Sequence, residues 1–214
     1  ILEDLGPTYI KVGQILSNRP DMLPEAYIEE LSKLRSDVRP MSYQEVLTIL
    51  REEMQENLFQ IFLSIERTPL GSASIAQVHK AILKDGQEVV IKVQRPHIKE
   101  IMIADIRVLK KAVSMLHIGK LFKDIISFDE VLDELLHTTL EEMHFLTEAN
   151  HIEEFYEENK ELKYIKVPKV YKKLTTEKVL VMEYIDGENI NATSHLENLG
   201  YDLDEIGSKL AENY

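Results

Sequence analysis

The sequence contains no cysteine in its 214 residues. Without thiols it forms no disulfide, no thiol nucleophile and no Cys-ligated zinc site, which agrees with a reducing compartment. Basic residues are also scarce, because 25 Lys and Arg stand against 38 Asp and Glu and give a formal net charge of −13. Since surfaces that bind nucleic acids are basic, this charge argues against a nucleic-acid partner.

Long apolar runs are missing as well. No run of about 18 apolar residues is present, so nothing in the sequence is expected to span a bilayer. Its first residues show no signal-peptide pattern. The chain starts at Ile1 rather than Met, which we interpret as an internal piece of a longer, cytoplasmic protein. Its length and its 44% hydrophobic content suit one large globular domain or two small ones.

A hairpin between Pro69 and Pro96 carries the chemistry of the sequence. Strands are predicted at 74–83 and 88–94, joined by a tight Asp-Gly turn. The period of two places Lys92 on one face of the second strand, near the loop of small residues that opens the hairpin. This loop consists of Gly71, Ser72, Ala73 and Ser74.

Such a hairpin is typical of a protein-kinase nucleotide site. Small loop residues let the backbone approach phosphates, and a lysine on the strand pairs with them. Alternatively, Lys92 is a solvated lysine on an ordinary hairpin, and the hairpin alone favours this alternative because short motifs match by chance.

Helices are predicted on both sides of the hairpin. Two capping boxes are predicted, at Ser42 with Glu45 and at Ser127 with Glu130. Together with apolar spacing they predict helices at 7–18, 25–34, 42–54, 97–123, 128–158 and 202–214, with strands at 59–67, 163–171 and 178–185. The helix at 97–123 carries six basic residues and two acidic ones between Lys99 and Lys123. That excess of base fits a surface facing a membrane or partner, although a solvated helix face is the favoured explanation.

Two further features would complete a kinase-like site. Glu148 lies on the acidic helix at 128–158 and would orient Lys92 if it reached that lysine, although it is one of many acidic residues there. The last predicted strand ends in a polar connector, where backbone groups would meet an adenine edge, as in a kinase hinge; an ordinary turn is the alternative. The residues concerned are Met182, at the back of the base pocket, and Glu183, Tyr184 and Ile185.

These segments together resemble the UbiB/ADCK family of atypical protein-kinase-like proteins. The specific marker is a K-x-G-Q signature, which is formed here by Lys11, Gly13 and Gln14 on one predicted helix. The sequence P-L-G-S-A-S-I-A-Q-V-H-K-A is similar to the alanine-rich loop of that family, with Gly71 and Ser72 at positions where alanine is more usual.

The resemblance extends to the ion pair and departs at one position. Lys92 matches the strand lysine of the family, and Glu148, in T-E-A-N, matches its helix partner. The E-x-D motif of the family falls on Glu142-Met143-His144, so His144 stands where the family has Asp. His does not replace a carboxylate at a metal or lysine contact. Either Glu142 of the motif suffices, or the coupling of the extension to the site is altered.

The resemblance implies an α+β fold with a protein-kinase-like N-lobe, an antiparallel sheet with one helix against it. We expect a helical extension at 1–56, the N-lobe at 57–187 with a helical insertion at 97–126 and the glutamate-bearing helix at 128–158, and the start of a C-lobe at 188–214. No H-x-D-x-x-x-x-N or D-F-G motif follows, so this chain alone is not expected to transfer a phosphoryl group.

The resemblance also implies a function. The intact protein would bind ATP and Mg²⁺, with the metal ligands in the C-lobe and none in this chain. Lys92 would contact the phosphates, and the extension would fold over the cleft as a regulatory element. The expected activity is that of an atypical kinase or ATPase linked to isoprenoid-quinone or lipid metabolism, peripheral at a membrane, with lipids or quinone-biosynthesis proteins as partners. A non-catalytic nucleotide-sensing or scaffolding module, or a helical interaction domain, are the alternatives.

Overall fold

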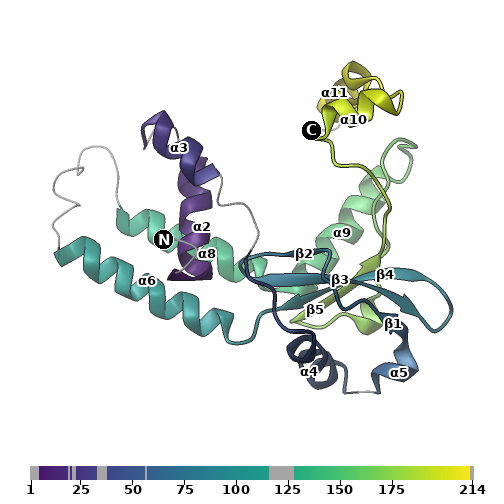
Figure 1. Cartoon of the computed structure of the whole chain (residues 1–214), viewed down its shortest axis with the longest axis horizontal. Helices are drawn as coiled ribbons and strands as arrows, with labels where there is room; N and C mark the ends of the chain where they lie inside the picture. Colours follow the sequence, from purple (N-terminus) through teal and green to yellow (C-terminus); the bar gives the residue numbers. More distant parts are fainter. Residues whose placement is uncertain are drawn as a thin grey trace.

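The computed structural model describes residues 5–18, 20, 23–32, 38–55, 57–115 and 128–212. Of residues 128 and 129 it describes only the backbone. Figure 1 shows a sheet with helices on both faces and a separate group of helices beside it. The elements are α2 (Pro7–Ser17), α3 (Glu25–Ser32), α4 (Tyr43–Met54), α5 (Leu58–Ile61), β1 (Phe62–Ile65), β2 (Gly71–Ser72), β3 (Ala76–Leu83), β4 (Glu88–Gln94), α6 (Ile98–Met115), α8 (Phe128–Glu142), α9 (Phe145–Asn159), the 3-10 helix η1 (Lys172–Leu174), β5 (Val179–Glu183), α10 (Thr193–Asn198) and α11 (Leu203–Glu212).

The sheet is antiparallel, with the strand order β1-β3-β4-β5 and with β2 paired to β3. The predicted hairpin is confirmed: β3 and β4 pair from Ala76↔Gln94 to Ile82↔Glu88. Gly86 closes the turn with a φ of +88°, a left-handed conformation that glycine adopts without steric cost. This register fixes which face of β4 each side chain occupies.

One face of the sheet packs against α4. Val89, Ile91 and Val93 alternate along β4 and form a buried cluster with Val46 and Leu50 of α4. The capping box predicted from the sequence is present at the start of α4. The amide of Glu45 donates to Ser42 Oγ (3.3 Å), and the amide of Ser42 donates to Glu45 Oε2 (2.8 Å). This arrangement satisfies backbone donors that a helix start leaves without partners.

The other face packs against α9 and the start of α6. Phe145 and Ala149 of α9 lie in a buried cluster with Leu180 of β5 and with Ile98 and Met102 of α6. The helix that carries Glu148 therefore approaches the sheet from the face opposite α4 (Figure 1).

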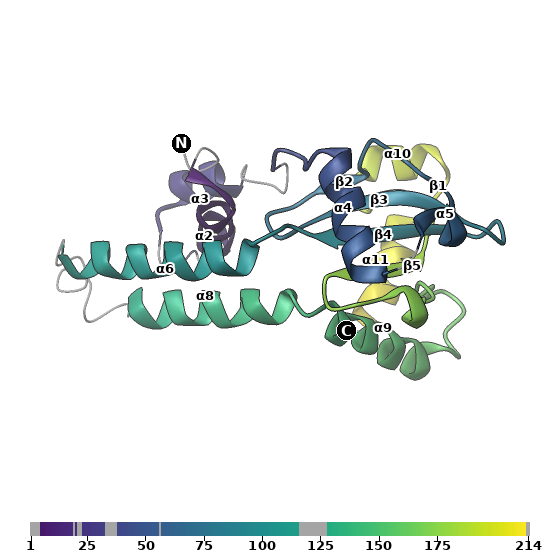
Figure 2. The ribbon, with the colours of Figure 1, turned by 90° about the horizontal axis from the view of Figure 1, so that it is seen from below.

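The remaining helices form a projecting group. α6 and α8 run side by side away from the sheet (Figure 2), and α2 lies across them (Figure 1). Val12 and Ile15 of α2 pack against Ile106 of α6 and Leu135 of α8. The buried hydroxyl of Thr8 also donates to Asp105 Oδ2 (2.6 Å), which fixes α2 to α6. None of the helices in the described ranges is long and apolar enough to cross a membrane.

The single helix predicted at 128–158 is wrong. The chain leaves the helical conformation at His144, with φ −90° and ψ 84°, and two helices result, α8 and α9. The break is stabilised by the sheet, because the side-chain amide of Gln94 donates to the carbonyl of Met143 (2.8 Å). Phe145 is fully buried just past the break.

Two predicted strands also differ from the structure. The strand at 59–67 is shortened to β1, because Asn57 Oδ1 accepts from the amide of Phe59 (3.0 Å) and starts the short helix α5 first. Residues 163–171 form no regular strand but one isolated bridge, Val170↔Met182, next to Pro168, which lacks an amide to donate.

The other predicted elements are present with adjusted ends. α3 covers Glu25–Ser32, β5 covers Val179–Glu183 and α11 covers Leu203–Glu212, and the predicted helix residues 33, 34, 213 and 214 lie outside the described residues. α6 covers 98–115 of the helix predicted at 97–123. Its last residues, including Lys120 and Lys123, and the cap predicted at Ser127 lie outside the described residues.

Candidate nucleotide-binding site

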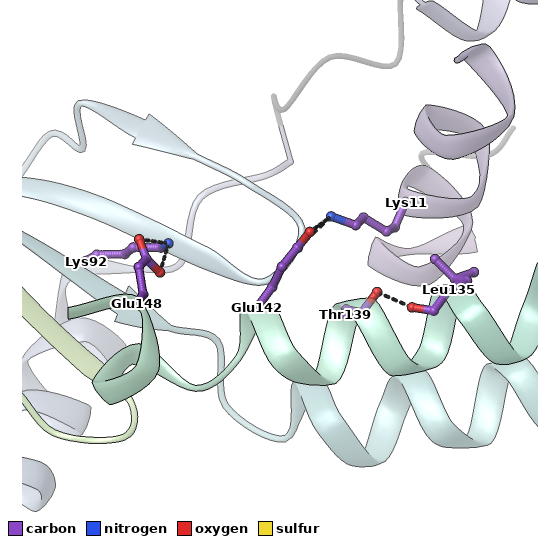
Figure 3. Close-up of polar contacts among 6 residues, drawn as sticks. All are labelled: Lys11, Lys92, Leu135, Thr139, Glu142 and Glu148. Atoms are coloured by element: carbon purple, nitrogen blue, oxygen red, sulfur yellow. Dashed lines mark hydrogen bonds and ion pairs between the residues drawn. The ribbon is translucent and has the colours of Figure 1, made fainter. Parts of the chain in front are cut away.

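The centre of the site is an ion pair between Lys92 and Glu148. Lys92 Nζ lies 2.9 Å from Oε1 and 2.7 Å from Oε2 of Glu148, although 56 residues separate the two in sequence (Figure 3). The lysine side chain is 22% exposed and the glutamate side chain 34%. The pair is thus partly shielded from water and still accessible to a ligand.

The position of each partner follows from its own element. Lys92 lies in the middle of the sheet, paired to Val78 on one side and Leu180 on the other, so its backbone is fixed. Glu148 lies in the first turn of α9, where the helix dipole stabilises a negative charge. The buried ring of Phe145 starts that helix, and the Lys92 ammonium lies 4.7 Å from the ring centroid, an additional cation–π contact.

The small-residue loop and Lys92 line one cavity. This cavity of about 640 Å³ is lined by Lys11, Gln14, Gly71, Ser72, Ala73, Ser74, Ile75, Ala76, Val78, Lys92 and Glu142. Its volume is in the range of cavities that accept small-molecule ligands. An anionic group entering it would meet loop backbone on one side and lysine ammonium groups on the other.

The extension reaches the same cavity through a second ion pair. Lys11 Nζ on α2 lies 2.7 Å from Oε1 and 2.5 Å from Oε2 of Glu142, at the end of α8 (Figure 3). Gln14, one turn further along α2, lines the cavity. Gly13 is buried inside α2, on the side that packs within the molecule. The K-x-G-Q residues and the first residue of the E-x-D motif are thus brought together.

A second cavity adjoins the first one. It has a volume of about 780 Å³ and is lined by Ile75, Lys92, Thr138, Glu141, Glu142, His144, Thr147, Glu148 and His151. Lys92 and Glu142 line both cavities and therefore lie between them. His144 is exposed at the break between α8 and α9, and its side chain makes no capping hydrogen bond to α9.

The residues predicted to form a hinge lie apart from these cavities. Met182, Glu183, Tyr184 and Ile185 line neither of them. The amide of Glu183 donates to the carbonyl of Lys169 (2.8 Å), and that of Tyr184 donates to the carbonyl of Glu88 (3.1 Å). Hydrogen bonds from Lys166 and from the Lys169 amide lower the pKa of the Glu183 carboxyl. Two amides expected to meet adenine are therefore already used within the protein.

The family follows from comparison with known proteins. A model of the ABC1 atypical kinase-like domain matches residues 33–214. The chain belongs to the ABC1 atypical kinase-like family. The resemblance inferred from the sequence motifs and the kinase-like α+β fold are thereby confirmed.

The ABC1-family relatives are considerably longer than this chain. It is 45% identical over 212 residues to an uncharacterized protein in the hydrogenase 1 5′ region of Clostridium pasteurianum, covering 99% of this chain and 40% of that protein. It is 38% identical over 212 residues to Protein ACTIVITY OF BC1 COMPLEX KINASE 8, chloroplastic, of Arabidopsis thaliana, and the match covers 98% of this chain and 28% of that protein. Over 207 residues it is 35% identical to AarF domain-containing protein kinase 1 of Gallus gallus, and the match covers 97% of this chain and 39% of that protein.

One solved structure is similar in fold and sequence. The complex of Rv3197 with erythromycin from Mycobacterium tuberculosis matches with a TM-score of 0.58 and 32% sequence identity. The match covers 84% of this chain and 45% of that one. The curated relatives and the solved structure therefore share one fold with this ABC1-family chain and extend well beyond the part it spans.

Sequence reasoning missed a polar network behind the loop. The buried side chains of Gln77 and His79 lie 2.8 Å apart, Nε2 to Nε2, and His79 Nδ1 lies 2.8 Å from the carbonyl of Glu66. Both fall on the face of β3 that packs against α4, at positions where the alternation predicts apolar residues. Two polar side chains in an otherwise apolar alternation are the signal that would have revealed it.

This network predicts a pH-dependent stability. Burial lowers the pKa of His79 below its usual value of 6.5, although the hydrogen bond to Glu66 opposes the shift. Protonation would also put two N–H donors, of His79 and Gln77, face to face. Because the folded protein binds this proton less readily than the unfolded chain, stability is expected to fall as pH drops below about 6.5.

The measurement is urea denaturation at pH 7.5 and pH 5.5 for the native protein and for His79→Gln. The variant is expected to be less stable at pH 7.5 and to lose less stability between the two pH values. The difference between the two proteins in stability lost from pH 7.5 to pH 5.5 isolates the contribution of His79, because the many carboxylates that titrate in acid are the same in both. Equal losses in both proteins would contradict the prediction.

Proposed function

We propose that this ABC1-family chain forms the nucleotide-binding lobe of an ATP-dependent atypical kinase or ATPase. The observation that carries the proposal is the two-oxygen contact of Glu148 with Lys92, next to the cavity lined by the small-residue loop. In protein kinases an equivalent lysine–glutamate pair positions the lysine on the nucleotide phosphates. Lys92 would accordingly contact the α- and β-phosphates, and Glu148 would orient it.

The other cavity residues would complete phosphate recognition. The loop at 71–74 would cover the phosphates with its backbone, and Lys11 would approach from the extension across the same cavity. Since Glu142 pairs with Lys11, it would set where that ammonium lies. These residues bind and orient the nucleotide, and none of them needs to accept a proton for this role.

Magnesium would accompany the nucleotide. Among the residues that the structure describes, no group of three or more His, Asp or Glu lies together in a way that could hold a metal ion. Mg²⁺ neutralises phosphate charge in such reactions, and the family resemblance implies that its ligands would lie in a C-lobe.

The biological setting proposed for the protein is a membrane surface. The relatives named as kinases support a kinase or ATPase. A link to isoprenoid-quinone or lipid metabolism is what the resemblance of the sequence motifs implies. The protein would lie in the cytoplasm at a membrane surface, with lipids or quinone-biosynthesis proteins as partners. A second candidate is a nucleotide-sensing or scaffolding module without turnover, and His144 in place of the motif Asp favours it.

The proposal predicts that Mg·ATP stabilises the protein. At a nucleotide concentration about a hundred times Kd, the free energy of unfolding is expected to rise by about 2.7 kcal/mol, because the ligand binds only the folded state. Thermal unfolding with and without Mg·ATP measures this effect, with Mg²⁺ alone and adenosine as controls. An unchanged Tm at saturating Mg·ATP would reject nucleotide binding and leave a helical interaction domain as the explanation.

Turnover distinguishes the two candidates. Continuous phosphate release from Mg·ATP by the full-length protein would establish the enzyme. Stabilisation by Mg·ATP with no phosphate release above the buffer rate would establish the sensing or scaffolding module.

A further inference from the structure

Arg95 lies behind the loop, directly after β4, and joins separate parts of the chain. Its Nε donates to the carbonyl of Ala73 (2.9 Å), and its Nη2 donates both to Ser72 Oγ (2.7 Å) and to the carbonyl of Arg39 (3.0 Å). Its own amide donates to the carbonyl of Ile75 (2.9 Å). One half-buried side chain thus contacts both the loop and the segment 38–41, which precedes α4.

A second set of hydrogen bonds joins the same two segments. The buried side chain of Gln77 accepts from the amide of Met41 (2.7 Å) and donates to its carbonyl (3.3 Å). Ser72 Oγ donates to Gln77 Oε1 (3.4 Å) while it accepts from Arg95, and the amide of Val38 donates to the carbonyl of Ser72 (3.3 Å). Ser72 therefore contacts both segment 38–41 and the two side chains that hold it.

Only arginine offers this set of donors from one position. Its planar guanidinium carries several N–H groups in a fixed geometry, whereas lysine carries one flexible ammonium group. Hydrogen bonds from a charged donor are also stronger than those between neutral groups. The loop position is thus set by side chains on the side away from the cavity, which leaves its other side for a ligand.

We propose that Arg95 is a positioning residue. It fixes the loop at 71–74 to the segment at 38–41, so that a displacement of one displaces the other. The segment connects the part of the chain that carries Lys11 to α4, and the loop lines the cavity that Lys11 also lines. A displacement of the segment is therefore transmitted to the loop. The consequence for phosphate recognition rests on the nucleotide-binding function proposed above.

The first test needs no ligand. Hydrogen exchange of the full-length protein is compared with that of Arg95→Gln and Arg95→Lys, with Arg107→Gln on the exposed face of α6 as the matched control. Exchange is expected to accelerate in the peptides covering 38–42 and 71–76 together in Arg95→Gln, less in Arg95→Lys, and not in the control. Acceleration of only one of the two segments, or of neither, would overturn the proposal.

The second test uses nucleotides of different charge. Arg95→Gln is expected to raise the Kd for Mg·ATP roughly tenfold and to leave the Kd for adenosine unchanged, because the loop faces phosphates. Arg95→Lys should recover part of the loss. A general destabilisation would instead weaken both ligands alike, and that result would overturn the positioning role, as would an unchanged Kd for Mg·ATP.

The two tests separate the inference from the proposed function. If the native protein binds no Mg·ATP, the nucleotide function fails, and hydrogen exchange alone decides whether Arg95 joins the two segments. If the native protein binds Mg·ATP and the Arg95 variants match it in both tests, the function stands and the inference is wrong. Circular dichroism and the Tm of each variant show whether that variant folds. If Arg95→Gln does not fold, the same two tests on Arg95→Lys, which keeps the charge, decide whether Arg95 positions the loop.

Discussion

Replacing Lys92 with alanine is expected to abolish measurable Mg·ATP binding, raising Kd at least about thirtyfold. Removing one partner of a hydrogen-bonded charge pair in an interface costs about 2 kcal/mol or more, which corresponds to this factor. The variant would also leave the Glu148 carboxylate facing the phosphates with no cation against it, so repulsion would add to the lost contact. The free energy of unfolding should change little, because the pair is partly exposed.

Calorimetric titration of the full-length protein with Mg·ATP measures this effect. Lys178→Ala provides the control, since Lys178 also pairs with a glutamate, Glu53, but on the side of the molecule near α4. Its affinity should equal that of the native protein. Glu148→Gln should weaken binding less than Lys92→Ala, because the lysine remains. Native affinity in Lys92→Ala would show that the nucleotide does not use this lysine.

Replacing Phe145 with alanine is expected to lower the free energy of unfolding by about 3–5 kcal/mol. The ring is 0% exposed and is among the largest fully buried side chains of the described core. It packs α9 and α6 against the sheet and lies beneath the Lys92 ammonium. Its removal would leave a cavity at the start of the helix that positions Glu148, so nucleotide affinity should fall as well.

Urea denaturation of the two proteins at neutral pH measures the loss. Leu146→Ala is the matched control, because this neighbouring side chain is 44% exposed and its truncation should cost less than about 1 kcal/mol. A loss below about 1 kcal/mol for Phe145→Ala would mean that α9 does not depend on this anchor.

The hairpin and the position of Lys92 were accessible from the sequence because both depend on local rules. The period of two and the Asp-Gly turn set the register of β3 and β4. That register places Lys92 on the face opposite Val89, Ile91 and Val93, which pack against α4. The helix pattern left its partner Glu148 as one candidate among many acidic residues, and the T-E-A-N match favoured it, since no local rule joins residues 56 positions apart.

The break between α8 and α9 was not accessible in this way. No proline or glycine interrupts the acidic helix near His144, and the helical spacing of apolar residues continues through it. The chain bends there because Gln94 of β4 donates to the carbonyl of Met143 and because Phe145 is buried against residues of β5 and α6. A periodic pattern carries no information about such partners, so tertiary contacts override it.

The role of Arg95 was hidden for the same reason. Its acceptors on Arg39, Ser72 and Ala73 lie 22 to 56 residues away in the sequence. The pattern after β4 shows only a polar residue before Pro96, which is typical of any strand end. Residues that position a loop from behind become visible only when the fold brings their partners together.

The most direct measurement is affinity labelling with an ATP analogue that carries a lysine-reactive acyl phosphate, followed by peptide mass spectrometry of the full-length protein. The account predicts that Lys92 is labelled and that excess Mg·ATP protects it, with weaker labelling at Lys11 across the cavity. Labelling spread over exposed lysines without protection by Mg·ATP, or protected labelling that omits Lys92, would contradict a phosphate site between the loop and the Lys92–Glu148 pair.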